Sequence, residues 1–256
     1  MKEYSEINNP QRGTIALLPN LLTTMSLFSG FYSIVSSING RFLHAAVAII
    51  VAGLFDGLDG RIARLTRTTS KFGEQYDSLC DLISFGVAPA LLAYLWVLKP
   101  YGRYGWLAAF LYVATTALRL ARFNSMIDET PKNVFVGLPC PAAAGMVSTS
   151  ILFCSFVGMS GTFPDVIMLL MMYGLSYLMV STHRYSSFKQ ISKTKFQFLV
   201  GMVLLLMVIA TEPQVTLFLL GVIYVLSGPL AGVYRMLAHK RKKSTEEQEE
   251  LAYKKQ

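Results

Sequence analysis

Long apolar runs separated by short polar joints dominate the pattern of this chain. About 20 mostly apolar residues are needed for a helix to cross a hydrocarbon core of about 30 Å, so these runs predict membrane-spanning helices. Eight spans are predicted, at residues 15–38, 42–64, 75–98, 104–122, 136–158, 164–181, 196–211 and 214–237. The pattern therefore predicts an all-α, polytopic transmembrane bundle in which the last two spans form a helical hairpin.

The joints between the spans are too short to hold a soluble domain. We expect a cytoplasmic N-terminal segment at 1–14, one transmembrane domain at 15–237 and a charged cytoplasmic tail at 238–256. The first segment has neither an apolar h-region nor a small-residue cleavage site, so no cleavable signal peptide is expected. Composition agrees with this organisation, because a chain that is 53% hydrophobic and 15% charged is too apolar for a soluble domain of this size.

Basic residues gather on one side of the predicted spans. If the N-terminus lies inside, all of the 23 Lys and Arg residues fall on the inner side except Arg41, Lys99 and Arg103. The positive-inside rule then predicts a multi-pass protein of the cell's inner membrane with both termini in the cytoplasm. The net charge of +8 is expected to face anionic lipid headgroups and substrates, and a nucleic-acid partner is not expected.

Four carboxylates stand within this apolar background: Asp56, Asp59, Asp77 and Asp81. An acid in the middle of a bilayer costs a few kcal/mol, so such residues are functional candidates. Each pair, at i,i+3 or i,i+4, shares one face of its helix. Asp56 lies about 21 Å from the outer end of its span, and Asp81 about 25 Å from the outer end of the next. The four are therefore expected to converge on one pocket near the cytoplasmic side.

Four uncompensated carboxylates would repel one another, and a divalent cation would relieve that repulsion. Ligation by oxygen alone indicates a hard ion such as Mg²⁺, Mn²⁺ or Ca²⁺, and such ions commonly orient phosphates. Gly60 and Gly73 would let a phosphate approach the backbone, and Arg64 offers a forked donor. The residues point to metal-assisted phosphate chemistry.

Two other interpretations start from the same acids. They could pair with Arg61, Arg64 and Arg67 in an interfacial salt-bridge cluster. A cation transporter could also use them, but it would need acids along a path through the membrane. Spans from 104 to 237 carry no acid in their apolar middles, which disfavours transport.

The acids, glycines and one arginine form a spaced motif that resembles the signature of the CDP-alcohol phosphotransferase family. It reads Asp56-x2-Asp59-Gly60-x2-Ala63-Arg64-x8-Gly73-x3-Asp77-x3-Asp81. The resemblance covers the first six spans and implies a six-helix catalytic core, to which the final hairpin is an addition. Members of that family transfer a phosphoalcohol group from a CDP-linked donor to a hydroxyl and release CMP.

The resemblance also implies a role for each motif residue. Asp56, Asp59 and Asp77 would hold the metals, expected to be two Mn²⁺ or Mg²⁺ ions, and Asp81, also a metal neighbour, would take the acceptor's proton. The CDP moiety would be bound by Asp59, Gly60, Ala63, Arg64 and Gly73. The resemblance makes a homodimer an expectation as well. Asn20, in the first predicted span, is a candidate for either a nucleotide contact or an interhelical hydrogen bond.

Three later segments, SFGVAPALLAY, ALRLARFN and VGLPCPAAAG, are similar to the phosphatidylserine synthase branch of that family. That similarity implies CDP-diacylglycerol as donor and L-serine as acceptor. Arg119 and Arg122 could receive the serine carboxylate and Asn124 its ammonium, although positive-inside anchoring is an alternative for the arginines. Glycerol 3-phosphate or inositol phosphate are the rival acceptors, and either would need a denser basic pocket.

Overall fold

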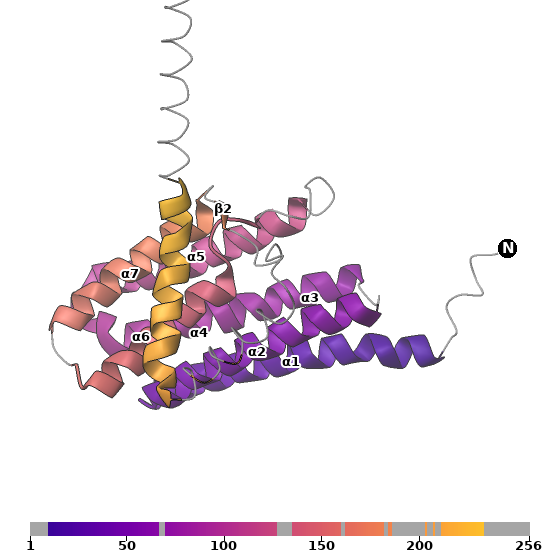
Figure 1. Ribbon diagram of the computed structural model, residues 1–256, viewed down its shortest axis with the longest axis horizontal. Helices are drawn as coiled ribbons and strands as arrows, with labels where there is room; N and C mark the ends of the chain where they lie inside the picture. The colour runs from indigo at the N-terminus through magenta and orange to yellow at the C-terminus, as the bar shows by residue number, and fades with distance from the viewer. Residues whose placement is uncertain are drawn as a thin grey trace, which may run out of the picture.

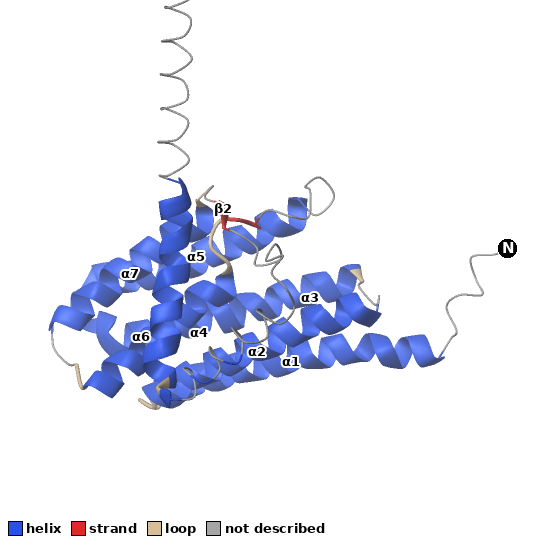
Figure 2. Ribbon diagram, in the orientation of Figure 1, coloured by secondary structure: helices blue, strands red, loops and turns tan. Residues whose placement is uncertain are grey.

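The computed structural model describes residues 10–66, 70–126, 135–159, 162–181, 184–185, 203, 207 and 211–232. Within these ranges the chain is almost entirely helical (Figure 2). The strands there are two short ones, β1 (Phe135–Val136) and β2 (Arg184–Tyr185), which pair antiparallel. The predicted all-α helical class is confirmed. Most of the predicted span 196–211 and all of the tail 238–256 lie outside the described residues.

Helices α1 (Pro10–Ile38) and α2 (Phe42–Thr66) form an antiparallel hairpin and lie side by side in Figure 1. The turn between them contains Gly40 at φ 72°, a left-handed conformation that favours glycine. The residues that α2 buries are mostly alanines, which let neighbouring helices approach closely. They are Ala45, Ala46, Ala48, Ile49, Ala52 and Asp59.

The third predicted span is a chain of short helical segments rather than one regular helix. It begins with α3 (Lys71–Asp81), continues through a π-helical turn at Leu82–Val87 into α4 (Ala88–Ala93), and passes through a second π-helical turn at Tyr94–Leu98. A 3₁₀ turn at Lys99–Tyr101 then leads into the next helix. The start of α3 is capped by Ser70, whose Oγ accepts a hydrogen bond from the Gly73 amide at 3.0 Å.

The remaining helices complete the bundle around this span. They are α5 (Gly102–Met126), α6 (Cys140–Val157), α7 (Thr162–Val180) and a last helix, Pro213–Gly232. Pro139 is the N-cap of α6 and Pro141 lies in its first turn, positions typical of a helix start. In Figure 1, α7 runs beside α5, and the last helix, in yellow, crosses in front of α6.

Large buried side chains mark the core where α4, α5, α6 and α7 meet. Fully buried examples are Phe85, Leu92, Tyr112, Val147 and Met172. By contrast, Phe28 and Ile38 on α1 are 64% and 67% exposed, as expected for side chains that face lipid. Five described helical stretches are long and apolar enough to cross a membrane, so the chain is an integral membrane protein.

Candidate functional site

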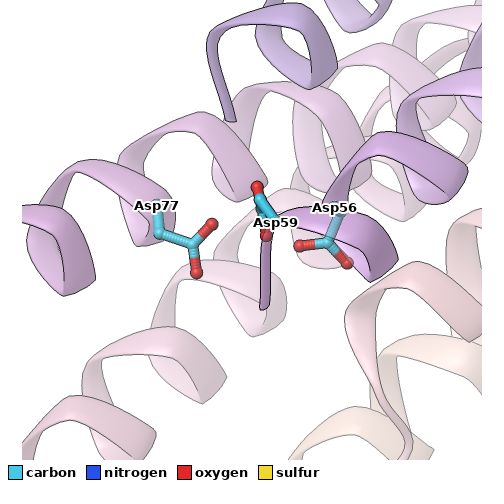
Figure 3. Close-up of side chains that lie close together, drawn as sticks. All are labelled: Asp56, Asp59 and Asp77. Atoms are coloured by element: carbon cyan, nitrogen blue, oxygen red, sulfur yellow. The ribbon is translucent and has the colours of Figure 1, made fainter. Parts of the chain in front are cut away.

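Three of the predicted acids converge between α2 and α3. Asp56 and Asp59 lie on α2 and Asp77 on α3, and one carboxylate oxygen of each lies within 4.8 Å of the others. Figure 3 shows the three side chains grouped together, with Asp77 directed from its own helix toward the two acids of α2. Asp59 is only 5% exposed, and its two neighbours are half-buried. The spacing of each pair on its helix thus produces a compact, oxygen-rich cluster.

Helix α1 supplies a contact to this cluster that the sequence reasoning missed. The Thr23 hydroxyl donates to Asp59 Oδ2 at 2.8 Å, and the same hydroxyl lies 3.0 Å from the Pro19 carbonyl oxygen. Thr23 and Asn20 are one helical turn apart on the predicted span 15–38, whose other polar side chains are all hydroxyls. A polar face on α1 directed toward α2 and the start of α3 could have been inferred from that spacing.

The cluster fits a hard divalent cation. Asp77 Oδ1 is buried and makes no hydrogen bond within the described part of the chain. A buried carboxylate oxygen without a partner is costly, and a cation shared with Asp56 and Asp59 would satisfy it. The three carboxylates therefore form a group that could hold a metal ion.

Asp81 stands next to this cluster rather than within it. It lies one turn beyond Asp77 on α3, and its carboxyl is within hydrogen-bonding reach of Asp56. It is not among the acids whose oxygens all lie within 4.8 Å of one another. The expected convergence of four carboxylates is thus a cluster of three with a fourth beside it.

The residues predicted to bind the CDP moiety lie on α2 and at the start of α3. Gly60, Ala63 and Arg64 are on the last turns of α2, where the Arg64 Nε donates to the Gly60 carbonyl oxygen at 2.6 Å. Asp59 therefore accepts its side-chain hydrogen bond from Thr23, and Arg64 donates to a backbone carbonyl oxygen. These hydrogen bonds do not pair Asp59 with Arg64. Arg67, another predicted salt-bridge partner, lies outside the described residues.

Gly73, in the first turn of α3, lies in a narrow space against α1. A Cβ added there would lie 3.2 Å from Ser70 Oγ and 3.5 Å from Asn20 Oδ1. Outside the helix's own backbone, a Cβ on Gly60 would meet no atom of the described residues closer than Arg64 Nη2 at 3.8 Å. The backbone near Gly60 is accordingly open to approach, while the Gly73 position is confined by the capping serine and by α1.

The predicted serine-binding residues all lie on the C-terminal half of α5. Arg119 donates from Nη1 to the Cys140 sulfur at 3.2 Å, and its Nε is buried without a hydrogen bond among the described residues. Asn124 Nδ2 donates a hydrogen bond to Ser78 Oγ at 3.0 Å. This bond joins α5 to α3 at the residue that follows Asp77 in the sequence. Arg122 is half-buried in the same turn.

The family described as CDP-alcohol phosphatidyltransferase matches residues 16–174, a range that contains all of these side chains. A CDP-diacylglycerol–serine O-phosphatidyltransferase of Helicobacter pylori is 36% identical over 221 residues, which are 86% of this chain and 93% of that protein. A protein of the same name from Mycobacterium leprae is 39% identical over 51% of this chain and 45% of its own length. An archaetidylserine synthase of Methanothermobacter thermautotrophicus is 36% identical over 70% of this chain and 73% of its own length.

Proposed function

This chain belongs to the CDP-alcohol phosphatidyltransferase family, and on that premise we propose that it transfers the phosphatidyl group of CDP-diacylglycerol to the hydroxyl of L-serine, giving phosphatidylserine and CMP. The observation that carries the proposal is the convergence of Asp56, Asp59 and Asp77 to within 4.8 Å inside a membrane bundle. Such a group of carboxylates suits chemistry at a diphosphate.

Serine is supported as the acceptor by the relatives. The bacterial proteins are named for CDP-diacylglycerol and serine, and the archaeal one for archaetidylserine. The names of the bacterial and archaeal relatives differ in the lipid, but both contain serine. Arg119 offers a positively charged group that could bind the carboxylate of serine. Its buried Nε has no hydrogen-bond partner within the described ranges. A serine carboxylate would supply the missing acceptor.

We assign the metal site to Asp56, Asp59 and Asp77, with Asp81 adjoining, and expect Mn²⁺ or Mg²⁺, two ions in the active enzyme. When bound, the cations would neutralise charge on the donor pyrophosphate. Gly60, Ala63, Arg64 and Gly73 would line the CDP moiety together with Asp59, where the open backbone at Gly60 gives a phosphate room to approach.

The transfer step is a direct in-line displacement. Asp81, beside Asp56, accepts the proton of the serine hydroxyl. The serine oxygen forms a bond to the phosphorus that carries diacylglycerol. The bond between that phosphorus and the bridging oxygen breaks, and CMP departs with the electron pair. No covalent enzyme intermediate is needed, so the protein acts mainly by positioning the two substrates.

The acceptor pocket is assigned to α5. Arg119 and Arg122 would bind the serine carboxylate, and Asn124 the ammonium group. Asn124 is held by Ser78, the residue that follows Asp77, so the pocket adjoins the acid cluster. Residues 15–237 would form the catalytic domain, with segment 1–14, tail 238–256 and the site itself on the cytoplasmic side. A homodimer stays a prediction.

An acceptor panel tests the proposal. Purified protein receives labelled CDP-diacylglycerol, Mn²⁺ or Mg²⁺, and one of L-serine, glycerol 3-phosphate or inositol phosphate. We expect CMP release and labelled phosphatidylserine with serine. Release of CMP with glycerol 3-phosphate but not with serine would contradict the assignment of the acceptor. Ion flux in liposomes without CMP release would contradict the transferase altogether.

A further inference from the structure

Two consecutive threonines of α1 contact the two helices that carry the acids. Thr23 donates to Asp59 on α2, and Thr24 Oγ1 lies 2.9 Å from the phenol oxygen of Tyr76 on α3. Consecutive residues of an α-helix point about 100° apart, so this pair can contact two neighbouring helices. Tyr76 directly precedes Asp77 in the sequence. The second bond therefore ties α3 to α1 beside the acid that α3 contributes to the cluster.

The phenol of Tyr76 is the donor in this bond. The Thr24 hydroxyl has a single proton, which it donates to the Asn20 carbonyl oxygen at 2.7 Å, so its oxygen is left to accept from the phenol. The Cys80 thiol is also within hydrogen-bonding reach of the phenol, but that contact lies within α3 and does not link it to α1. The Tyr76 ring stacks on Phe72 with centroids 6.1 Å apart, a contact that a phenylalanine would keep.

Ser26 makes a second bridge from α1 to the same two parts of the bundle. Its Oγ donates to the Ala52 carbonyl oxygen on α2 at 3.1 Å, and its own carbonyl oxygen accepts from Ser84 Oγ at 3.1 Å. Ser84 lies in the π-helical turn that continues α3. Within the described residues α1 packs along both α2 and α3, whereas the backbones of α2 and α3 come close to each other at few points. The separation of α2 from α3 is therefore set largely through α1.

That separation controls the distance across the acid cluster, where oxygens of Asp56, Asp59 and Asp77 lie within 4.8 Å of one another. Oxygens on opposite sides of a bound Mg²⁺ are about 4.0–4.2 Å apart, and those on opposite sides of Ca²⁺ are about 4.6–5.2 Å apart. Mg²⁺ also requires near-ideal octahedral geometry, whereas Ca²⁺ accepts a flexible one. If α3 were free to move away from α2, the site would bind Mg²⁺ less tightly and Ca²⁺ almost as before.

We propose that Tyr76 is a positioning residue that holds Asp77 at the distance from Asp59 that a small divalent cation requires, and that it thereby sets the preference of the site for Mg²⁺ over Ca²⁺. The inference deepens the proposed function and rests on its metal site. It gives α1 a role in selecting the ion, through Thr23 on one side and Thr24 on the other.

The test measures metal binding directly, on purified protein without substrates. Mn²⁺ loses the sharp EPR signal of the free ion when it binds, so the signal reports the concentrations of Mg²⁺ and of Ca²⁺ that displace half of the bound Mn²⁺. We expect the ratio of the Ca²⁺ concentration to the Mg²⁺ concentration to fall about 3- to 10-fold in Tyr76→Phe, the range for loss of one hydrogen bond. Thr24→Val should lower the ratio equally and the double variant no further, because all three lack the same bond.

Tyr173→Phe is the matched control. It removes a phenol hydrogen bond of 3.1 Å to the Tyr104 carbonyl oxygen, between helices α7 and α5 that carry none of the clustered acids. Its ratio should equal that of the unmodified protein. An unchanged ratio in Tyr76→Phe would overturn the inference, and so would an equal fall in Tyr173→Phe, which would indicate a general loosening of the bundle. Absence of Mn²⁺ binding by the unmodified protein would instead contradict the metal site of the proposed function, and this inference with it.

Discussion

Thr23 on α1 donates a hydrogen bond of 2.8 Å to the carboxylate of Asp59 on α2. Each of the two residues is only 5% exposed, so the bond is shielded from water. It joins a helix that carries none of the acidic motif to the most buried acid of the cluster. Helix α1 therefore takes part in setting the geometry of the site.

Replacing Thr23 by valine keeps the side-chain shape but removes the hydroxyl. We expect the concentration of Mn²⁺ needed for half-maximal CMP release to rise about 10- to 100-fold, the usual effect of losing a residue that orients a metal ligand. A Mn²⁺ titration of activity measures this. Thr115→Val is the control, because within the described residues the Thr115 hydroxyl bonds only to carbonyl oxygens of its own helix. Equal Mn²⁺ requirements in both variants would show that Thr23 does not orient Asp59.

Gly30 on α1 lies directly against the first π-helical turn. A Cβ at Gly30 would stand 2.5 Å from Ser84 Oγ and 2.7 Å from the Ser84 Cα, so backbone would have to move. Gly30→Ala is expected to lower the free energy of unfolding by about 1–3 kcal/mol, as overpacking does. Thermal unfolding in detergent measures the change. At Gly174, no described residue outside the helix's own backbone would lie within 4 Å of an added Cβ, so Gly174→Ala should not be destabilising. Equal midpoints for the two variants would contradict the close contact at Gly30.

Much of the architecture and of the acid cluster follows from sequence patterns. Apolar runs predict the helices, and i,i+3 and i,i+4 spacing predicts that each acid pair shares a face. The cluster Asp56, Asp59 and Asp77 forms because the acidic faces of α2 and α3 are turned toward each other. The position of Asp81 beside the cluster could not be predicted, because it depends on the relative rotation of two helices.

Irregular segments and single contacts between distant helices were also beyond sequence reasoning. The π-helical turn Leu82–Val87 lies between Asp81 and Pro89, yet neither residue type by its position specifies a π-helical turn rather than a continuous α-helix. The bond from Arg119 to Cys140 depends on where α6 begins after the residues that separate it from α5. Such features depend on packing between elements, which no local pattern records.

Ser78 and Asn124 exchange hydrogen bonds of 3.0 and 3.2 Å between α3 and α5. A double-mutant cycle with Ser78→Ala and Asn124→Ala should give a coupling energy of about 1 kcal/mol in the free energy of unfolding. Either substitution removes the contact between the two side chains, so removing the second partner costs less once the first is gone. Strictly additive effects of the two substitutions on the free energy of unfolding would mean that Ser78 and Asn124 act independently. Asn124 would then not be held by Ser78.

The charge distribution predicts which joints face the cytoplasm. Asn39, in the turn between α1 and α2, should lie outside, and Lys71, at the start of α3, inside; both are exposed. A membrane-impermeant maleimide should label Asn39→Cys in intact cells and Lys71→Cys only after permeabilisation. The unmodified chain gives the background from its own cysteines, of which Cys80 and Cys140 are buried. The reverse labelling pattern would place the acid cluster on the outer side.

The central claim is that Asp56, Asp59 and Asp77 together hold the cation on which transfer depends. The most direct test is the Mn²⁺ dependence of CMP release by chelator-treated enzyme, measured for the unmodified protein, for Asp77→Asn and for Asp165→Asn, an acid on α7 outside the cluster. We predict no release without Mn²⁺, recovery on its addition in the unmodified and Asp165→Asn proteins, and at least about a tenfold loss of Mn²⁺ response in Asp77→Asn. Full turnover in the presence of chelator, or an unchanged Mn²⁺ response in Asp77→Asn, would contradict the claim.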